Sequence, residues 1–474
     1  MTAPGTPSNP LRVAIVGSGP AAFYAAEYLL KQPDLAVQVD MLERLPTPYG
    51  LVRGGVAPDH QKIKTVIRIY EGVAKLPGFR FFGNVEYGCH VTLEDLDAHF
   101  HQVLIATGAQ TDRRIGVPGE DLAGIHSATE FVAWYNAHPD FRDRRFDLTR
   151  ENAAIIGVGN VAIDVARILL LPHAVRASTD MADHAIGALE TSGVRHVTMI
   201  GRRGPAQAAF TNLELKELGE DIDGDVVVRA DELELDPESA AEVEKGGRIA
   251  KEKMDVLRAY AAKPRSGNDR ALEIRFFLSP VEFRGDASGH VTSLVLEKNE
   301  LARGEDGAIV CRGTGVTEEI PVGLAFRSVG YKGVALAGVP FDAKRGVVPN
   351  EKGRVLSAPG GEVVRGLYAT GWIKRGPSGV IGTNKADSVE TAKQMLEDRA
   401  AERVLAPRAP DAAAFAALVA ERQPRAVVYA DWQRLDQLET ERGVAASRPR
   451  IKFCSVEDML SALAKASSAE RSPS

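Results

Sequence analysis

The sequence predicts an α/β protein with two Rossmann-like dinucleotide-binding domains, and three observations lead to this fold class. A short apolar segment runs into a glycine-rich turn near residue 17, followed by a helical segment and a second apolar segment. The same succession begins again at residue 153. The chain has 474 residues, enough for about three domains, and its 44% hydrophobic and 26% charged residues are typical of a soluble globular protein.

The first unit begins with Leu11–Val16, whose continuous apolar character is typical of a buried parallel strand. Helical periodicity predicts a helix over Phe23–Leu30, and a second strand is expected over Val37–Leu42, directly before Glu43. Strand, glycine-rich turn, helix and strand together form a βαβ unit with an acidic residue at its end.

The turn of this unit has the residues that a dinucleotide needs. Gly17 allows the tight turn, Gly19 lets the backbone approach a pyrophosphate, and Ala22 lets the helix pack near the strand. The helix N-terminus adds its partial positive charge. Glu43 can accept hydrogen bonds from both ribose hydroxyls and repels a 2′-phosphate, so the site is predicted to hold FAD or NAD. The alternative is a glycine-rich structural turn.

The second unit repeats this logic with different charges. A strand is predicted over Ala153–Ile156, a turn at Gly157–Ala162, a helix over Ile163–Leu171 and a strand over Val197–Ile200. No acidic residue follows this last strand, which runs into Gly201-Arg202-Arg203.

Two guanidinium groups at the adenosine ribose fit a 2′-phosphate. Each charge-assisted contact contributes about 1.5–3 kcal/mol. Arg202 and Arg203 therefore favour NADP(H) over NAD(H). The alternative is a pair of solvated arginines on a loop.

Other segments complete the predicted organisation. Residues 46–60 are rich in Pro and Gly and are predicted to be irregular, and a helix is expected from about Ile63 to Lys75. Residues 217–270 are interpreted as a helical hairpin or as an excursion from the second domain. Two buried strands that end in ATG corners are expected at Val103–Thr107 and Gly366–Thr370.

Composition excludes several classes of function. The chain has 58 Lys and Arg against 64 Asp and Glu, a net charge of −6, so we expect no nucleic-acid partner. No apolar stretch approaches the roughly 20 residues of a membrane helix, so no integral membrane association is expected. The three cysteines are far apart and form no C-x-x-C, which argues against a disulfide framework or a local zinc site and favours the reducing cytoplasm.

Several longer strings resemble the adrenodoxin reductase-type ferredoxin–NADP reductases, and their bacterial members in particular. The resemblance covers about residues 10–400 and rests on GSGPAAFYAAEYLL, PYGLVRGGVAPDH, GNVAIDVARILL, GRRGPAQAAFTNLEL, SVGYK, FDAKRGVVPN and ATGWIKRGPSGVIGTN. The tail, with ADWQRLDQLE and PRIKFCSVEDML, resembles the extension of bacterial members. One departure is Ala22, where many members have a third glycine, and we expect only a small helix shift from it.

The resemblance implies a domain organisation in which the NADP domain is inserted into the FAD domain. The implied bounds are 1–110 for the first part of the FAD-binding domain, 111–324 for the NADP-binding domain, 325–404 for the second part of the FAD-binding domain and 405–474 for a C-terminal helical extension.

It also implies the residues at each nucleotide. Together with the glycine turn, the residues implied to contact FAD are Gly17, Gly19, Ala21, Glu43, Leu51, Val85, Trp372, Gly379, Val380 and Ile381. Those implied to contact NADP are Val158, Gly159, Asn160, Val161, Arg202, Arg203, Glu214 and the backbone of Gly379. His60 and Asp164 are implied to be polar residues near the flavin, and together with Glu214 they are our candidate catalytic residues.

The implied activity is transfer of a hydride from NADPH to FAD, followed by transfer of single electrons to ferredoxin or flavodoxin. Hydride transfer needs no side-chain base, so His60 and Glu214 are interpreted as orienting or proton-linked groups. Asp164 lies about one helical turn after Asn160 and is expected either to cap locally or to face the nicotinamide amide.

A partner surface for ferredoxin has to be local, because ferredoxins are acidic and the chain is also net negative. The segment 245–270 is the candidate, with Arg248, Lys251, Lys253, Arg258, Lys263 and Arg265. An ordinary solvated helix face is the alternative.

Other functions remain open at this point. A pyridine nucleotide-disulfide reductase would need a C-x-x-C, and the small subunit of glutamate synthase would need cysteine-rich iron–sulfur ligands near the N-terminus; this sequence has neither. The alternatives kept are a non-catalytic FAD/NADPH-binding redox sensor and an NADPH-dependent flavin monooxygenase.

Overall fold

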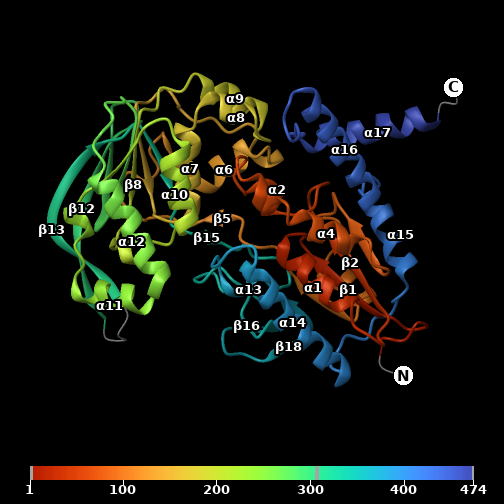
Figure 1. The fold of residues 1–474 in the computed structure, drawn as a ribbon. Coiled ribbons are helices and arrows are strands. Elements are labelled where there is room, and N and C mark those ends of the chain that lie inside the picture. The colour runs from red at the N-terminus through yellow and green to blue at the C-terminus, as the bar shows by residue number, and fades with distance from the viewer. Residues whose placement is uncertain (1–3, 305–308, 472–474) are drawn as a thin grey trace.

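The computed structural model describes residues 4–304 and 309–471 and contains two large sheets, each with helices packed against it (Figure 1). The first unit, drawn in red and blue, holds the N-terminal and C-terminal segments. The second unit, in yellow and green, is formed by the middle of the chain. This is the predicted α/β fold class.

The first sheet has seven strands in the order β16-β17-β18-β4-β1-β2-β3. From β18 to β3 all neighbours are parallel, whereas β16, β17 and β18 pair antiparallel. The strands span Leu11–Val16 (β1), Val37–Leu42 (β2), Phe79–Phe82 (β3), Gln102–Ile105 (β4), Asn350–Glu351 (β16), Arg354–Leu356 (β17) and Val363–Ala369 (β18).

Strand β1 shows why a continuous apolar run forms this strand. Leu11, Val13 and Ile15 belong to a core on one face of the sheet. Ala14 and Val16 belong to a second core on the other face. Side chains alternate between the two faces of a strand, and here both faces are covered by a core. Apolar residues are therefore needed at successive positions of β1. Helices α1 (Pro20–Leu30) and α14 (Thr383–Ala400) contact each other on the first of these faces.

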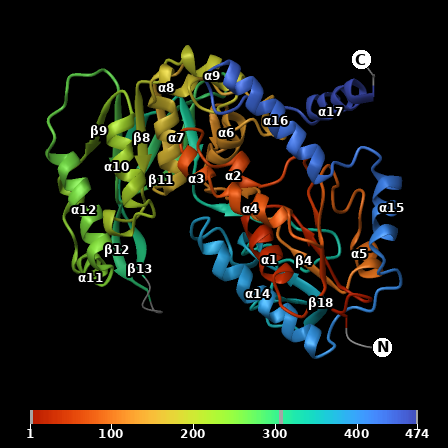
Figure 2. The ribbon, with the colours of Figure 1, turned by 45° about the vertical axis from the view of Figure 1, so that its right-hand side comes forward.

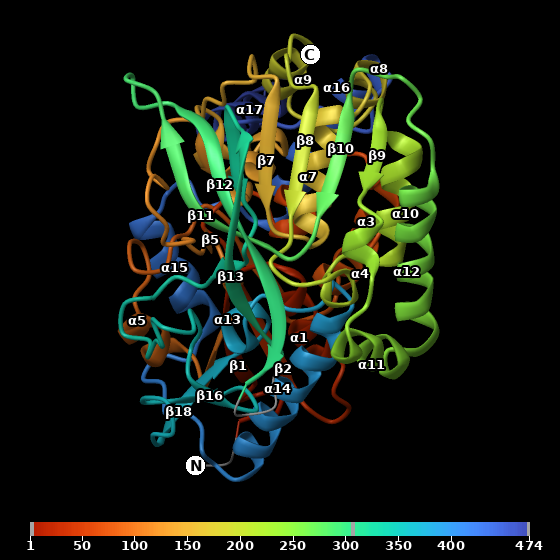
Figure 3. The same cartoon turned by 90° about the vertical axis from the view of Figure 1, so that its left-hand side faces the viewer.

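The second sheet has six strands in the order β6-β14-β7-β8-β10-β9, and every neighbouring pair is parallel. The strands span Ile125–Ser127 (β6), Asn152–Ile156 (β7), His196–Ile200 (β8), Asp225–Val228 (β9), Ala271–Arg275 (β10) and Leu324–Arg327 (β14). Figure 3 shows a three-stranded antiparallel sheet to the left of β7, and this sheet shares a core with β7 and β8. Its strands are β11 (Leu278–Gly285), β12 (Val291–Arg303) and β13 (Ile309–Pro321).

The chain enters and leaves the second unit at one place. Strand β5 (Thr111–Asp112) pairs with β15 (Tyr331–Lys332) in a two-stranded ribbon. Along the chain, the six strands of the second sheet come between β5 and β15. Strands β16 to β18, which complete the first sheet, follow β15. The predicted insertion of one domain into the other is therefore confirmed.

Some local predictions were wrong. Within residues 46–60, a short helix α2 forms at Leu51–Gly54, the stretch that lacks proline. The helix expected from Ile63 to Lys75 is divided into α3 (Gln61–Lys64) and α4 (Ile67–Ala74). Between them, hydrogen bonds join each N–H to the carbonyl three residues earlier, as in a tightened helical turn.

Residues 217–270 combine both interpretations and add a strand. Helices α11 (Pro237–Lys245) and α12 (Gly247–Ala262) form the predicted hairpin, and α12 also packs on α10 (Asn212–Asp221). The strand β9 was missed, because its four residues are too short for a clear pattern and its apolar residues follow an acidic stretch.

The C-terminal segment forms α15 (Ala412–Arg422), α16 (Tyr429–Ala445) and α17 (Val456–Arg471). Phe415 of α15 and Trp432 of α16 are buried in the two cores of the first sheet. Figures 1 and 2 show α16 along the side where the two units meet. Among residues 4–304 and 309–471, no helix combines the length and the apolar character that crossing a membrane requires.

Candidate functional site

The first glycine corner lies where β1 ends and α1 begins. Gly17 has φ +102°, and a Cβ atom there would lie 2.6 Å from the carbonyl oxygen of Ala106 at the end of β4. Only glycine fits this position. Gly19 has open space where a Cβ would point, and α1 begins after it without a side-chain cap. The backbone N–H groups of this helix end are therefore left for a ligand, as pyrophosphate binding requires.

Glu43 lies beside this corner, at the end of β2. Its Oε2 atom accepts hydrogen bonds from the Ser18 backbone N–H (3.2 Å) and the Ser18 hydroxyl (2.6 Å). Its Oε1 atom accepts one from the Leu45 backbone N–H (3.1 Å). The carboxylate thus lies where the spacing predicted it, within reach of a ribose at the corner.

The second glycine corner has the same construction at the ends of β7 and β14. Gly157 has φ +134°, and a Cβ atom there would lie 2.2 Å from the Ser328 carbonyl oxygen. Gly159 has no atom closer than 4.0 Å to where its Cβ would lie, and α7 (Asn160–Leu170) begins after it without a side-chain cap. In both sheets the corner lies at the point where the strand order reverses, which is where such sheets bind nucleotides.

Arg202 and Arg203 follow β8 at the edge of this second corner. Both are exposed, and neither forms a salt bridge with any residue in the described ranges. Their backbone is held in place, because Asn299 of β12 donates to the Arg202 carbonyl oxygen (2.8 Å) and the Phe277 N–H donates to that of Arg203 (3.2 Å). The two guanidinium groups are thus free to bind a phosphate.

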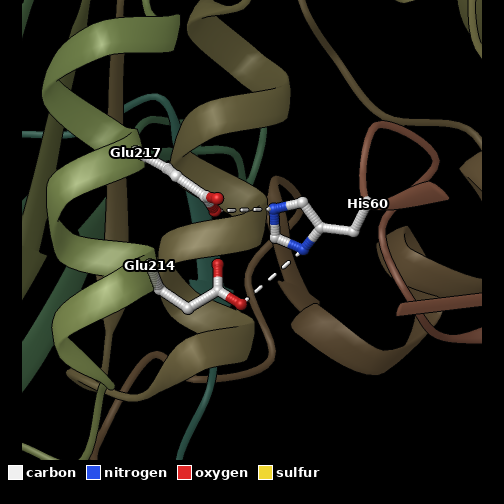
Figure 4. Close-up of side chains that lie close together, drawn as sticks. All are labelled: His60, Glu214 and Glu217. Carbon is white, nitrogen blue, oxygen red and sulfur yellow. Dashed lines mark ion pairs between the residues drawn. The ribbon is translucent and has the colours of Figure 1, made fainter. Parts of the chain in front are cut away.

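A third cluster lies between the two units (Figure 4). His60, from the first unit, directs one ring nitrogen toward Glu214 (Nδ1 to Oε1, 3.6 Å) and the other toward Glu217 (Nε2 to Oε2, 3.4 Å), both on α10 of the second unit. One ligand atom from each of the three residues fits within 4.8 Å, a spacing that a metal ion could use. Arg167 already supplies a positive charge beside Glu214, however (Nη1 to Oε2, 3.2 Å), so we assign no metal here.

Arg167 organises this cluster, and the sequence analysis missed it. Its side chain is fully buried on α7. It donates to Asp59 (Nε to Oδ2, 2.6 Å) across the two units, to Asp164 (Nη2 to Oδ1, 2.8 Å) and to Glu214. A charged residue within the apolar run VARILL was the available signal, since a buried charge needs partners.

Burial shifts the titration of all three candidate catalytic residues. It raises the pKa of Asp164 to about 8, and nearby Glu214 adds to this rise. Burial also raises the pKa of Glu214. Burial and the charge of Arg167 lower the pKa of His60 to about 4. At neutral pH, His60 is therefore a neutral imidazole between two carboxyl groups, and Asp164 carries a proton.

The Asp164→Asn variant tests this protonation. The folded-state pKa of Asp164 is raised above the ordinary 3.8, so the folded protein binds the extra proton between about pH 4 and pH 8 and wild-type stability falls as pH rises through that window. The amide that replaces the carboxyl group can still accept from Arg167 but does not titrate. We expect the stability of the variant relative to wild type to rise by roughly 3–4 kcal/mol from pH 5 to pH 8.

Thermal unfolding of both proteins across this pH range measures the difference. Asp255→Asn is the control, because Asp255 is an exposed aspartate of α12 that pairs with Arg258. Parallel pH profiles for wild type and Asp164→Asn would show that Asp164 is ionised in the folded protein.

The remaining predicted residues divide between the two corners. At the first corner, a Cβ at Gly371 would lie 2.7 Å from Ala21, which brings the segment of Trp372 against α1. Gly50, just before Leu51, similarly approaches Gly19. The Val85 N–H donates to the Glu43 carbonyl oxygen (2.9 Å). Leu51, Val85 and Trp372 are thus gathered near one site, as predicted.

At the second corner, Val158, Asn160 and Val161 lie at the start of α7. The Asn160 side chain accepts from the Thr211 N–H (2.8 Å), and Thr211 caps the helix that carries Glu214. Gly379, Val380 and Ile381 lie in the loop before α14, and Ile381 packs against the core of the first sheet. The contact of each residue with a cofactor stays a prediction.

Comparison with known proteins agrees with this geometry. Residues 11–222 match the family model of pyridine nucleotide-disulphide oxidoreductases. The chain is 47% identical over 463 residues to NADPH-ferredoxin reductase FprA of Mycobacterium tuberculosis, covering 95% of this chain and 99% of that protein. It is 41% identical to the mitochondrial NADPH:adrenodoxin oxidoreductase of Arabidopsis thaliana, covering 96% of each. The solved structure of Mycobacterium tuberculosis FprA in complex with NADPH has a TM-score of 0.89 and 45% identity, over 96% of this chain and 100% of that one.

The two sheets with their glycine corners and the family match define the class, which is that of oxidoreductases with two dinucleotide-binding units. Within this class the chain belongs to the adrenodoxin reductase-type ferredoxin–NADP reductases, because the similarity extends over nearly its whole length. The resemblance seen in the sequence motifs is thereby confirmed.

Proposed function

We propose that this protein is an FAD-dependent NADPH–ferredoxin reductase. The observation that carries the proposal is the pair of glycine corners with opposite charges, a carboxylate at the first and two free guanidinium groups at the second. The first corner fits an unphosphorylated ribose, as in FAD, and the second fits the 2′-phosphate of NADPH. Relatives that cover almost the whole chain have the names NADPH-ferredoxin reductase and NADPH:adrenodoxin oxidoreductase.

The cofactors supply the hydride and one-electron chemistry, and the protein binds and orients them. Gly19 and the start of α1 would bind the FAD pyrophosphate, with Glu43 on its ribose. Gly159 and the start of α7 would do the same for NADPH, with Arg202 and Arg203 on its phosphate. His60, Asp164 and Glu214 would hold a proton at the junction of the units, and the burial that raises the pKa of Asp164 to about 8 supports this role.

We also propose the bounds of the domains. The predicted FAD domain consists of residues 1–110 and 325–404, and the predicted NADP domain of residues 111–324. The two large sheets support this division. The predicted end of the NADP domain at 324 falls inside β14, a strand of the second sheet. We therefore move this junction to the ribbon of β5 and β15. Residues 405–474 form the C-terminal extension.

The purified protein tests the function directly. We expect a yellow protein whose flavin absorbance is bleached by NADPH faster than by NADH, and cytochrome c reduction that requires added ferredoxin. Rapid hydrogen peroxide release with an organic substrate would favour the monooxygenase. Bound FAD without any turnover would favour the redox sensor.

The ferredoxin surface is proposed on helix α12 and the loop after it. Lys251 and Arg258 are already paired with Glu244 and Asp255, and Lys253 donates to a backbone carbonyl. Of the six basic residues in segment 245–270, the other three are exposed and form no salt bridge within the described ranges: Arg248, Lys263 and Arg265.

Charge reversal of Arg248, Lys263 and Arg265 to glutamate is expected to raise the KM for ferredoxin about tenfold at low ionic strength, because like charges slow association. Turnover with a small dye should not change. Reversal of Arg408, an exposed arginine of the extension, is the control. An unchanged KM for ferredoxin would exclude this segment as the docking surface.

The acceptor and the compartment are further proposals. Flavodoxin is proposed as a second acceptor, and a panel of ferredoxins and flavodoxins from the host would compare the two. A reducing compartment such as the cytoplasm is supported by Cys89, Cys311 and Cys454, which are all free thiols.

A further inference from the structure

The loop of residues 376–382 lies between α13 (Trp372–Arg375) and α14 and carries three of the residues predicted to contact the cofactors. Its carbonyl groups are held by side chains. Arg375 Nη2 (3.2 Å) and Trp372 Nε1 (3.2 Å) both donate to the Ser378 carbonyl oxygen. Asn384 Nδ2 donates to that of Ile381 (3.2 Å).

Three N–H groups of the same loop are left without partners in the described part of the protein, whereas those of Gly376, Ser378 and Val380 have one. Within the described residues, the backbone N–H groups of Gly379, Ile381 and Gly382 donate to no protein atom. Helix α14 begins directly after them with no side-chain cap on its first turn. Free donors at a helix N-terminus are suited to a ligand with negative charge or carbonyl oxygens. The loop is therefore held by its acceptors while its donors stay available.

A single guanidinium group joins both ends of the loop. Arg375 Nη2 donates to Ser378 before the free donors and to the Asn384 side chain after them (Oδ1, 3.0 Å). Both of these contacts come from Nη2, while the second terminal nitrogen, Nη1, faces Asp387 (3.1 Å). The planar fork thus contacts the loop and Asp387 from two fixed nitrogens, which the single nitrogen of a lysine cannot reproduce. Within the described residues, the buried Nε of Arg375 has no hydrogen-bond acceptor, and its buried Nη1 has only the ion pair with Asp387.

Arg375 is oriented in turn by Asp387 of α14. The Asp387 side chain is 8% exposed and accepts from the Gly371 N–H (Oδ2, 2.6 Å) at the ATG corner. It forms ion pairs with Lys374 (Oδ1 to Nζ, 3.0 Å) and with Arg375 (Oδ2 to Nη1, 3.1 Å). One buried carboxylate therefore joins the end of β18, helix α13 and the loop.

The geometry points to Asp387 and Arg375 as a pair of positioning residues that hold the loop 376–382 in the shape in which its free N–H groups bind the flavin. This inference rests on the proposed function, since it assumes that FAD occupies the first corner. The loop donors would stabilise the negative charge of reduced flavin, so the pair affects both FAD affinity and flavin potential.

Four variants test the pair. Arg375→Gln removes the charge and the fork, Arg375→Lys keeps only the charge, and Asp387→Asn keeps the shape of the anchor without its charge. Glu390→Gln is the matched control, because Glu390 also pairs with Lys374 (2.7 Å) from α14 but its side chain is 50% exposed and has no contact with the loop.

The measurements are the FAD dissociation constant and the flavin midpoint potential, with the visible spectrum of the bound flavin. We expect Arg375→Gln, Arg375→Lys and Asp387→Asn to bind FAD at least tenfold more weakly and to have more negative potentials, while Glu390→Gln equals wild type. If Asp387→Asn does not fold, the two Arg375 variants still test the pair, because they leave Asp387 and its contact with the Gly371 N–H in place.

The outcomes separate this inference from the proposed function. A wild-type protein that binds no FAD contradicts the proposed function. A wild type that binds FAD and is reduced by NADPH, with Arg375→Gln and Asp387→Asn equal to it in affinity and potential, contradicts the positioning role alone. Wild-type values for Arg375→Lys alone would show that charge, and not the fork, is what matters, which also overturns the inference.

Discussion

Replacing Arg202 and Arg203 together by alanine is expected to raise the KM for NADPH about 100-fold and to leave the KM for NADH nearly unchanged, because NADH lacks the 2′-phosphate. Each charge-assisted contact contributes about 1.5–3 kcal/mol, and about 1.4 kcal/mol corresponds to a factor of ten. Two such contacts would give more than 100-fold if they were independent, but both side chains are exposed and solvent weakens them.

Steady-state reduction of a dye acceptor with NADPH and with NADH measures this change. Arg195→Ala is the matched control, since Arg195 directly precedes the same strand β8 at its opposite end and contacts backbone carbonyls there. An equal loss with both nucleotides would mean that the two arginines support the loop and do not bind the phosphate.

Asp180→Ala is expected to have the largest effect on stability. The Asp180 side chain is 3% exposed and lies between two buried lysines, Lys64 of α3 (Nζ to Oδ1, 2.7 Å) and Lys452 of the C-terminal segment (Nζ to Oδ2, 3.2 Å). Burial opposes its ionisation, but Lys452 and Lys64 hold the pKa of Asp180 below its ordinary value. Burial lowers the pKa of Lys452 to about 7.

These three residues join three parts of the chain. Lys64 belongs to the first unit, Asp180 to the second, and Lys452 follows α16. Arg448 strengthens the same junction by donating to the carbonyl oxygens of Thr179 and Met181. The C-terminal segment from 448 to 452 therefore connects the second unit to the first.

Removing the carboxylate leaves two buried ammonium groups without their partner. Loss of one member of a buried ion pair costs about 3–5 kcal/mol. An unfolding entropy of about 2.1 cal/mol/K per residue amounts to roughly 1 kcal/mol per degree for 474 residues, so we expect the midpoint of thermal unfolding to fall by about 4 °C. Asp183→Asn is the control, because Asp183 also pairs with the tail through Arg448 but is 62% exposed, and we expect less than about 1 kcal/mol from it.

A second substitution separates loss of charge compensation from general damage. Lys452→Met in the Asp180→Ala background removes one of the unpaired charges and should recover part of the lost stability, since apolar replacement of buried pairs is often tolerated. Equal midpoints for wild type and Asp180→Ala would show that the junction contributes little.

The two nucleotide corners were determined by the sequence. Gly17 and Gly157 adopt positive φ beside a carbonyl oxygen, a local requirement that only glycine meets. Glu43 and Arg202 follow strands whose apolar character is clear, and the carboxyl ends of parallel strands lie at one edge of a sheet. The periodicity of hydrophobic residues and the need for glycine in a tight turn both depend on only a few neighbouring residues. They can therefore be recognised in the sequence without knowing the fold.

The partners of the buried charges were decided only by the tertiary structure. Arg167 contacts Asp59, 108 positions earlier, and Glu214, 47 positions later. Lys452 lies beside Asp180, and Asp387 holds the N–H of Gly371. No local pattern encodes these pairs, because the free energy of a buried charge depends on which distant elements exclude water from it and which opposite charge they bring.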